Sequence, residues 1–311
     1  MRATGGLLAA LCLGLAPAAN AEPAGDPAPE AVLASLAFEK GAPPRTIVID
    51  LAPKGNARRL RFQLDTGAST SYVTPRLARA MGVKVSRIKQ DAYRRSTVLG
   101  RDVQFYVDTS SSDSGSANGQ EWGLLGGDFL SDYVVELDFA RQRVRFLDPD
   151  RYAVPAPGDA EDEATLPLKL VSHRPGLRAS VEGRAVDMLV DTGFAAGLVL
   201  SGPMAREAGV AFEPVPGLRF AGTSGFSDGH AGDVARFEIG PFAFERIPTT
   251  VLPNGFFNRG FAGDSILGYD VLAHFLVRID YPRQRIWLQR RADSPPFYDP
   301  RRTVESRAAA P

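Results

Sequence analysis

The chain contains two copies of one sequence pattern, and this internal repeat constrains its fold more than any other feature. Residues 61–85 (RFQLDTGASTSYVTPRLARAMGVKV) match residues 186–212 (VDMLVDTGFAAGLVLSGPMAREAGVAF). Further along, residues 124–146 match residues 266–288 without a gap, at a separation of 142 residues. Two copies are too few for a solenoid, in which each unit stacks on its neighbours. The repeat therefore predicts two lobes related by an approximate two-fold axis.

Each copy has the residue pattern of a mainly β fold. Apolar residues alternate with polar ones, as in LRFQL at 60–64, and Gly, Pro and Asp separate the runs. Short helices are expected after each Asp-Thr-Gly, at Pro75–Met81 and Pro203–Ala208. Two more are expected after the later glycines, at Asp128–Asp132 and Asp270–His274. The fold class is therefore mainly β, with two pseudo-symmetric lobes.

Composition shifts along the chain predict where the lobes begin and end. A flexible lead-in rich in Pro, Ala and Glu is expected, and a linker that is first Pro-rich and then acidic. The final segment carries several Pro and Arg and is expected to be disordered or loosely attached. The predicted order is signal peptide 1–21, lead-in 22–44, N-terminal lobe 45–150, linker 151–165, C-terminal lobe 166–291 and tail 292–311.

The first residues have the features of an export signal. Arg2 precedes an apolar run from Gly5 to Ala19, and Ala19-Asn20-Ala21 is a small-x-small cleavage site. The run is about 15 residues, short of the roughly 20 that span a bilayer; an uncleaved anchor is the alternative. The single cysteine, Cys12, lies in this segment, so the mature chain has neither disulfides nor thiol chemistry. We expect an exported protein, periplasmic or secreted, without a membrane span after signal cleavage.

Charge and histidine content exclude several functions. Lys and Arg number 36, as do Asp and Glu, so no overall field attracts nucleic acid or an anionic membrane. The histidines, at 173, 230 and 274, are widely spaced and have no cysteine partner, which argues against a zinc site. A phosphate-binding glycine loop is also missing from the sequence. We therefore expect no metal, no cofactor and no nucleic-acid partner.

The motif that could carry catalytic chemistry is Asp-Thr-Gly, which ends an apolar run in both copies. Asp65 and Asp191 begin the two motifs. One such tripeptide is an ordinary turn. Two of them in matched contexts would be brought together by the predicted two-fold axis, if that axis passes between the two loops. Two carboxylates about 3 Å apart share one proton, so one can act as general base on a water while the other donates a proton. Duplication of a purely structural turn is the alternative.

These motifs resemble those of the retropepsin- and pepsin-type aspartic peptidases, in a single-chain form with two Asp-Thr-Gly lobes. The resemblance covers roughly residues 45–291 and implies two retropepsin-like β-barrel lobes that hydrolyse peptide bonds with an activated water. In that family a later apolar-apolar-Gly segment braces each loop, as Leu124-Leu125-Gly126 and Ile266-Leu267-Gly268 would here. Carried over, the site comprises catalytic Asp65 and Asp191, supporting Thr66, Gly67, Thr192 and Gly193, and bracing Gly126 and Gly268.

The sequence departs from that family in two respects. Ala68 and Phe194 follow the glycines, where pepsin-like enzymes often have a hydroxyl that bonds a carboxylate. The family also covers its cleft with a glycine-rich hairpin, and Ala221–Gly232 is the candidate here, with a mobile surface loop as the alternative. The first half offers only the shorter segment Tyr93–Gly100, in which Tyr93 is a candidate flap tyrosine.

Two other functions are alternatives to that of an endopeptidase. Gly263-Asp264-Ser265 resembles the nucleophile segment of GDS-type serine hydrolases, but it lies late in the chain and no Gly-x-Ser-x-Gly elbow is present. A catalytically silent exported peptide-binding module of the same fold is the other alternative, favoured by Phe194 and the short first flap. Both complete Asp-Thr-Gly motifs favour an active enzyme with a peptide or protein substrate. Two lobes in one chain make a monomer plausible.

Overall fold

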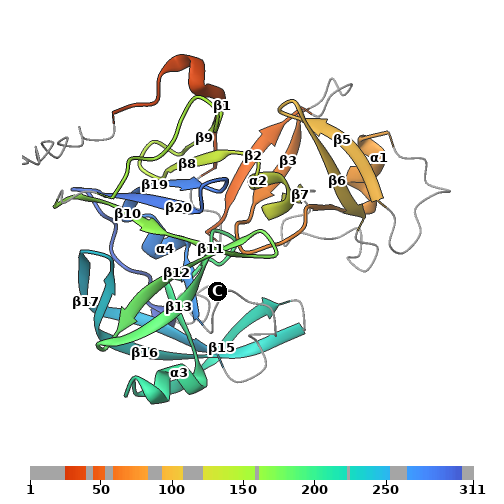
Figure 1. Ribbon diagram of the computed structural model, residues 1–311. Coiled ribbons are helices and arrows are strands. Elements are labelled where there is room, and N and C mark those ends of the chain that lie inside the picture. Colours follow the sequence, from red (N-terminus) through yellow and green to blue (C-terminus); the bar gives the residue numbers. More distant parts are fainter. Residues whose placement is uncertain are drawn as a thin grey trace, which may run out of the picture.

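The computed structural model describes residues 25–39, 45–52, 59–82, 93–107, 122–157, 161–222, 225–252 and 265–302. These residues form three β-sheets with short helices between their strands, as Figure 1 shows. The prediction of a mainly β fold is confirmed. Within the described residues, no helix has the length and apolar character needed to cross a membrane.

Each half of the chain builds one sheet of its own. The first-half sheet runs in the order β2 (Ile47–Leu51), β3 (Leu60–Leu64), β7 (Trp122–Leu125), β4 (Tyr72–Val73), β6 (Arg101–Val107), β5 (Tyr93–Val98). The second-half sheet runs β11 (Lys169–Val171), β12 (Arg174–Val181), β13 (Arg184–Asp191), β18 (Ser265–Gly268), β14 (Leu198–Ser201), β17 (Phe242–Leu252), β16 (Gly225–Ile239), β15 (Phe212–Gly222). The order from β12 to β16 repeats the order from β2 to β5, so the sequence repeat is also a repeat of strand topology.

The third sheet takes three strands from each half, and we call it the shared sheet. Its order is β1 (Val32–Ala37), β9 (Arg143–Leu147), β8 (Val134–Asp138), β19 (Phe275–Asp280), β20 (Arg285–Arg290), β10 (Glu163–Pro167). Strands β8 and β19 meet antiparallel at its centre, where Glu136 lies directly opposite Arg278. These two residues are 142 apart and thus occupy the same position in the two copies. The approximate two-fold axis therefore passes between them.

Short helices follow the positions that the sequence predicted, with ends shifted by one or two residues. Helix α1 begins after Thr74, whose side chain accepts a hydrogen bond from Leu77 N–H, and α3 begins after Ser201, which caps Met204 N–H in the same way. Both helices have proline in the first turn. A backbone N–H at that position would have no acceptor within the helix, so its absence in proline costs no hydrogen bond. The helices are η1 (Pro29–Ala31), α1 (Pro75–Ala80), α2 (Gly127–Leu130), α3 (Gly202–Glu207) and α4 (Tyr269–Leu272).

Three segments expected to be irregular contribute to the fold. In the lead-in, Val32–Ala37 forms edge strand β1 on β9, and at the end of the linker, Glu163–Pro167 forms the opposite edge, β10, on β20. The expectation of a loosely attached tail is wrong for its first residues. Phe297 stacks on His274 at a ring distance of 4.1 Å, and Arg301 makes an ion pair with Asp233. The predicted boundaries of the lobes themselves stay predictions.

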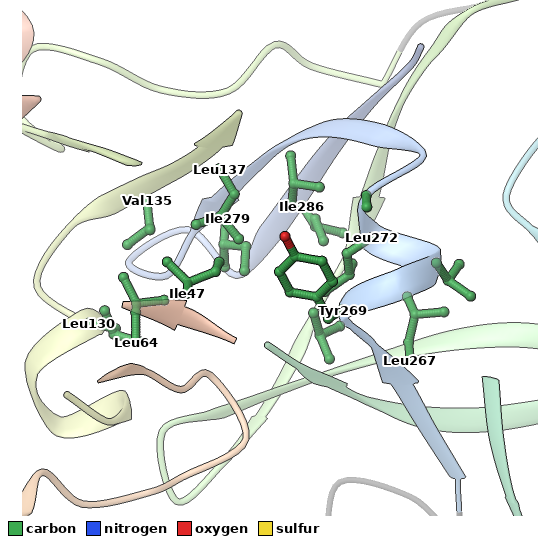
Figure 2. Packing of buried hydrophobic residues seen from close by; sticks show 14 of the residues in the cluster. Ile47, Leu64, Leu130, Val135, Leu137, Leu267, Tyr269, Leu272, Ile279 and Ile286 are labelled. Atoms are coloured by element: carbon green, nitrogen blue, oxygen red, sulfur yellow. The ribbon is translucent and has the colours of Figure 1, made fainter. Parts of the chain in front are cut away.

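The hydrophobic core joins the two halves beneath the Asp-Thr-Gly loops. Buried side chains from all three sheets and from helix α4 pack in one cluster. Burying one such aliphatic side chain stabilises the fold by about 1.5–3 kcal/mol, so this cluster holds the halves in fixed register. Figure 2 shows Ile47, Leu64, Leu130, Val135, Leu137, Leu267, Tyr269, Leu272, Ile279 and Ile286.

Candidate active site

Each Asp-Thr-Gly motif sits at the end of a strand that is held by a parallel neighbour. Leu64 pairs with Leu125 of β7, and Asp191 pairs with Gly268 of β18. A β-carbon on Gly126 would lie 2.8 Å from the backbone of Thr70, and one on Gly268 would lie 2.1 Å from the carbonyl oxygen of Ala196. Only glycine fits at such an approach, so the two loop-and-brace pairs depend on Gly126 and Gly268.

The two carboxylates face one another across the axis. A β-carbon added to Gly67 would lie 2.3 Å from Asp191 Cγ, and one added to Gly193 would lie 2.4 Å from Asp65 Oδ2. Each carboxylate therefore rests against the glycine of the opposite loop, in space that any larger residue would fill. Asp65 and Asp191 are both half-buried, so they are reachable from the surface.

Backbone amides hold the carboxylates in place. Gly67 and Ala68 each donate an N–H bond of 2.9 Å to Asp65 Oδ1, and Gly193 donates one of 2.8 Å to Asp191 Oδ1. Because charge-assisted bonds of this kind are stronger than neutral ones, they fix the orientation of both side chains. Oδ1 of each carboxylate is thereby held by the backbone of its own loop.

The threonines lock the loops together through crossed hydrogen bonds. Thr66 Oγ1 donates to Val190 O at 2.7 Å and accepts from Thr192 N–H at 3.0 Å. Thr192 Oγ1 donates to Leu64 O at 2.8 Å and accepts from Thr66 N–H at 3.1 Å. Both threonines are fully buried. Each half thus completes the hydrogen bonding of the other, and the distance between the two aspartates is set by this exchange.

Burial raises the pKa of both carboxyls. For Asp65, loss of solvent raises the pKa, and hydrogen bonds from Ala68 and Gly67 lower it only in part. For Asp191, burial and the charge of Asp65 raise the pKa well above its ordinary value. Two interacting carboxyls titrate as a pair, so the arrangement favours one proton shared between them over two full charges.

Several residues near the dyad were not identified from the sequence. The phenol of Tyr281 is fully buried beneath the site, and burial together with the charge of Asp65 raises its pKa. Phe194 stacks on Phe220 of β15, with ring centroids 5.2 Å apart. Arg174 begins β12 beside the end of β13. Tyr281 and Phe220 lie far from the motifs in sequence, and only the fold brings them close, whereas Phe194 directly follows the second motif.

The predicted flap segments form hairpins. The segment Ala221–Gly232 contains the end of β15 and the first part of β16, which pair antiparallel. Residues 223–224, between the two strands, lie outside the described residues. Strands β5 and β6 pair around a tight turn at Leu99 and Gly100, both with positive φ. Tyr93 begins β5, and its side chain is outside the described part. Whether either hairpin covers the cleft stays a prediction.

The alternative chemistries find little support in this arrangement. Ser265, the nucleophile of the serine-hydrolase alternative, is fully buried in β18, where it pairs with Met188. Among the described residues, His, Cys, Asp and Glu form no group of three or more that could hold a metal ion. The site is therefore a pair of carboxylates with amide and hydroxyl support.

Comparison with known families agrees with the geometry. Residues 177–271, which include the second Asp-Thr-Gly and its brace, match the family model described as aspartyl protease. The resemblance to retropepsin- and pepsin-type aspartic peptidases is confirmed. The match covers one of the two copies of this aspartic-peptidase pattern. Among curated proteins, none matches the chain.

Three solved structures to which the chain is similar are as follows, each with a TM-score below 0.5. A retropepsin-like aspartic protease from Rickettsia conorii is 21% identical, with 41% of this chain and 90% of that one covered and a TM-score of 0.29. Basic 7S globulin from soybean is 12% identical, with 85% and 99% covered and a TM-score of 0.47. The aspartic proteinase from Irpex lacteus is 14% identical, with 84% and 98% covered and a TM-score of 0.49.

Proposed function

We propose that the chain is an aspartic endopeptidase in which Asp65 and Asp191 together activate a water molecule. The observation that carries the proposal is the mutual seating of each carboxylate against the opposite glycine. That geometry supports a dyad sharing one proton, which a pair of separate surface carboxylates would not do. The family match over residues 177–271 supports the same class of enzyme.

The proposed reaction needs no covalent intermediate and no metal ligand from the protein. The ionised member of the dyad accepts a proton from water as the oxygen attacks the peptide carbonyl carbon. The protonated member donates to the carbonyl oxygen, which gives a neutral tetrahedral diol. Collapse of the diol breaks the C–N bond, with a proton passing to the leaving nitrogen. The crossed threonines keep the two carboxyl groups at the separation that this exchange requires.

Cleavage of a mixed peptide library by residues 22–311, from about pH 3 to pH 8, tests the mechanism. We expect Asp65→Asn and Asp191→Asn each to lower kcat by about 10²–10⁴-fold or more. Asp187→Asn is the matched control, because Asp187 lies on the same strand as Asp191 but is 55% exposed and pairs with Arg178. Unchanged cleavage in both dyad variants would exclude the mechanism. Peptide binding without cleavage by the unmodified protein would instead favour the silent binding module.

We also propose that the protein is exported and that peptides or proteins outside the cytoplasm are its substrates. The proposal rests on the apolar run and the Ala19-Asn20-Ala21 site of the sequence. N-terminal sequencing of the protein expressed from its full-length gene in a Gram-negative host tests it. Mature protein that begins at Glu22 in the periplasmic fraction is the expected result. An intact N-terminus on cytoplasmic protein would contradict it.

A further inference from the structure

We propose that residues 294–302, which we call the strap, hold the second Asp-Thr-Gly loop in its catalytic position. The strap acts through Asp270 of helix α4, where it takes the place of a serine that the first loop has and the second loop lacks. The inference rests on the proposed function, since it assigns a positioning role in the same site. The strap is a positioning element and not a catalytic one, because its effect on the dyad passes through the helix.

In the first half, a serine within the loop connects the loop to the helix that follows its brace. Ser71, the sixth residue after Asp65, donates to the carboxylate of Asp128 through its amide at 2.9 Å and its hydroxyl at 2.6 Å. The same hydroxyl accepts a bond of 2.9 Å from the N–H of Gly126. Since Asp128 is in helix α2, the loop, the brace and the helix form one hydrogen-bonded unit.

The second half has no such serine, and other segments take its place. Gly197 occupies the position that matches Ser71, so this loop offers no hydroxyl to Asp270. Asp270 is nonetheless only 1% exposed, and a buried carboxylate without partners is costly. The guanidinium of Arg45 binds its Oδ1, and the N–H of Tyr298 donates to its Oδ2. The strap thus supplies one of the two partners that replace the serine.

Helix α4 is bonded directly to the second loop. The N–H of Tyr269, its first residue, donates to the carbonyl oxygen of Phe194 at 2.9 Å, and the N–H of the preceding residue donates to that of Gly197 at 2.7 Å. A β-carbon on Gly197 would lie 3.4 Å from Asp270 Cβ and 3.5 Å from its Oδ2. Phe194 and Gly197 both follow Asp191 in this loop. A displacement of Asp270 would therefore reach the second catalytic carboxylate.

Contacts on both sides of Tyr298 keep its N–H in place. Before it, Phe297 stacks on His274, with ring centroids 4.1 Å apart. After it, the guanidinium of Arg301 pairs with the carboxylate of Asp233 in β16 at 2.6 Å. The strap is therefore attached to the end of helix α4 and to a strand of the second-half sheet, with the bond to the helix carboxylate between these two points.

Removal of the strap tests the proposal. We expect residues 22–293 to lose about 10- to 100-fold in kcat with little change in KM, because a small displacement of a catalytic group lowers turnover without weakening substrate binding. Residues 22–302 are the control, since they keep the strap and end directly after it, and they should cleave as residues 22–311 do. Circular dichroism checks that each truncated chain is folded.

A serine at position 197 should make the strap dispensable. In residues 22–293, Gly197→Ser gives the second loop the hydroxyl that Ser71 provides in the first, and we expect it to recover most of the lost kcat. The new β-carbon fits with a small shift of Val271 Cγ2, which would lie 3.3 Å away. Gly197→Ala is the matched control, since it fills the same space without a hydroxyl and should recover nothing.

Two point variants test the same contact in the complete chain, without truncation. Tyr298→Pro removes the N–H that donates to Asp270, whereas Tyr298→Ala keeps this N–H. Both variants remove the ring, so the difference between them isolates the hydrogen bond. We expect kcat to be clearly lower for the proline variant, and Gly197→Ser to narrow the difference.

Hydrogen exchange of backbone amides, followed by mass spectrometry, separates this proposal from the proposed function because it needs no turnover. Loss of the strap should speed exchange in residues 191–197 but not in residues 65–71, and Gly197→Ser should reverse this effect. If no chain cleaves but this pattern is seen, the peptidase proposal fails and the strap keeps its role. Unchanged kcat and exchange in residues 22–293, or equal kcat within either matched pair of variants, overturns the inference.

Discussion

Replacing Thr66 with valine removes two buried hydrogen bonds while keeping the shape of the side chain. The lost bonds are those from Thr66 Oγ1 to Val190 O, at 2.7 Å, and from Thr192 N–H to Thr66 Oγ1, at 3.0 Å. A net hydrogen bond contributes about 0.5–1.5 kcal/mol, and a buried group left without a partner costs about 1–3 kcal/mol. We therefore expect Thr66→Val to lower the free energy of unfolding by about 2–4 kcal/mol.

The equivalent threonine of the second copy provides an internal check on this expected loss of stability. Thr192→Val removes the matching bonds to Leu64 O and from Thr66 N–H, at 2.8 Å and 3.1 Å, so its cost should be similar. The double variant should cost less than both single variants added together, because loss of one crossing loosens the loop that the other crossing holds. Thr66→Ser and Thr192→Ser keep the hydroxyl and lose one buried methyl group, for which about 1 kcal/mol is expected.

Equilibrium unfolding in urea, followed by circular dichroism, measures these differences from the shift of the midpoint at constant slope. The order of the variants in free energy of unfolding is the test. Each valine variant should be clearly less stable than the serine variant at the same position. If valine and serine cost the same, the hydroxyl bonds do not hold the two loops together. Strict additivity in the double variant would show that the two crossings act independently.

Two other features of the fold give predictions that the same unfolding assay can check. Glu136→Gln should cost about 3–5 kcal/mol, because it leaves the buried guanidinium groups of Arg145 and Arg278 without their common carboxylate; a change under about 1 kcal/mol would contradict this account. His274 is buried against Phe297, and burial lowers its pKa to about 4. The unfolded chain therefore binds this proton first, so stability present above about pH 6.5 is lost as the pH falls toward 4. His274→Gln should flatten that part of the pH profile, and an unchanged profile would assign the loss to other groups.

The repeat made the core of the site predictable. A three-residue motif, its brace and a constant separation are local patterns, and sequence preserves them because glycine is the only residue that fits beside Thr70, Ala196 or the opposite carboxylate. The strands around the motifs were also visible, since they alternate apolar and polar residues. Their topology then follows, because a loop-and-brace pair in each half requires the parallel contact of β3 with β7 and of β13 with β18.

The edge strands were missed because edges place few demands on sequence. Strand β1 lies at one end of the shared sheet and β10 at the other, and each pairs on one side only. The residues of β1 alternate between half-buried and exposed, so no strongly apolar face marks the strand. Proline-rich neighbours add to the impression of a linker. Backbone hydrogen bonds to β9 and β20 order these segments, and such bonds leave no pattern in the side chains.

The contacts of Asp270 were missed because equivalent aspartates in the two copies have different partners. In the first half, the carboxylate of Asp128 accepts bonds from the amide and hydroxyl of Ser71. The matched Asp270 has glycine at the corresponding position, and its buried carboxylate instead pairs with Arg45 and accepts from the N–H of Tyr298. The exchange of Ser71 for a glycine was a visible signal that Asp270 needs another partner. Which segment supplies it depends on contacts between residues far apart in the chain.

The shared sheet explains why the two copies differ where they do. Glu136 and Arg278 occupy one repeat position and lie directly opposite each other at the axis. In a pairing of two identical halves, that position would face its own copy, and like charges directly opposite destabilise a sheet. Arg145 and Trp287 are a second matched pair: the first binds Glu136, and the second lies 4.5 Å from the Arg278 guanidinium. These pairings require two unlike halves, whereas the dyad requires two like ones. Symmetry is therefore kept at the carboxylates, where a shared proton depends on it, and is broken at the axis of the shared sheet, where opposite charges can pair only if the copies differ.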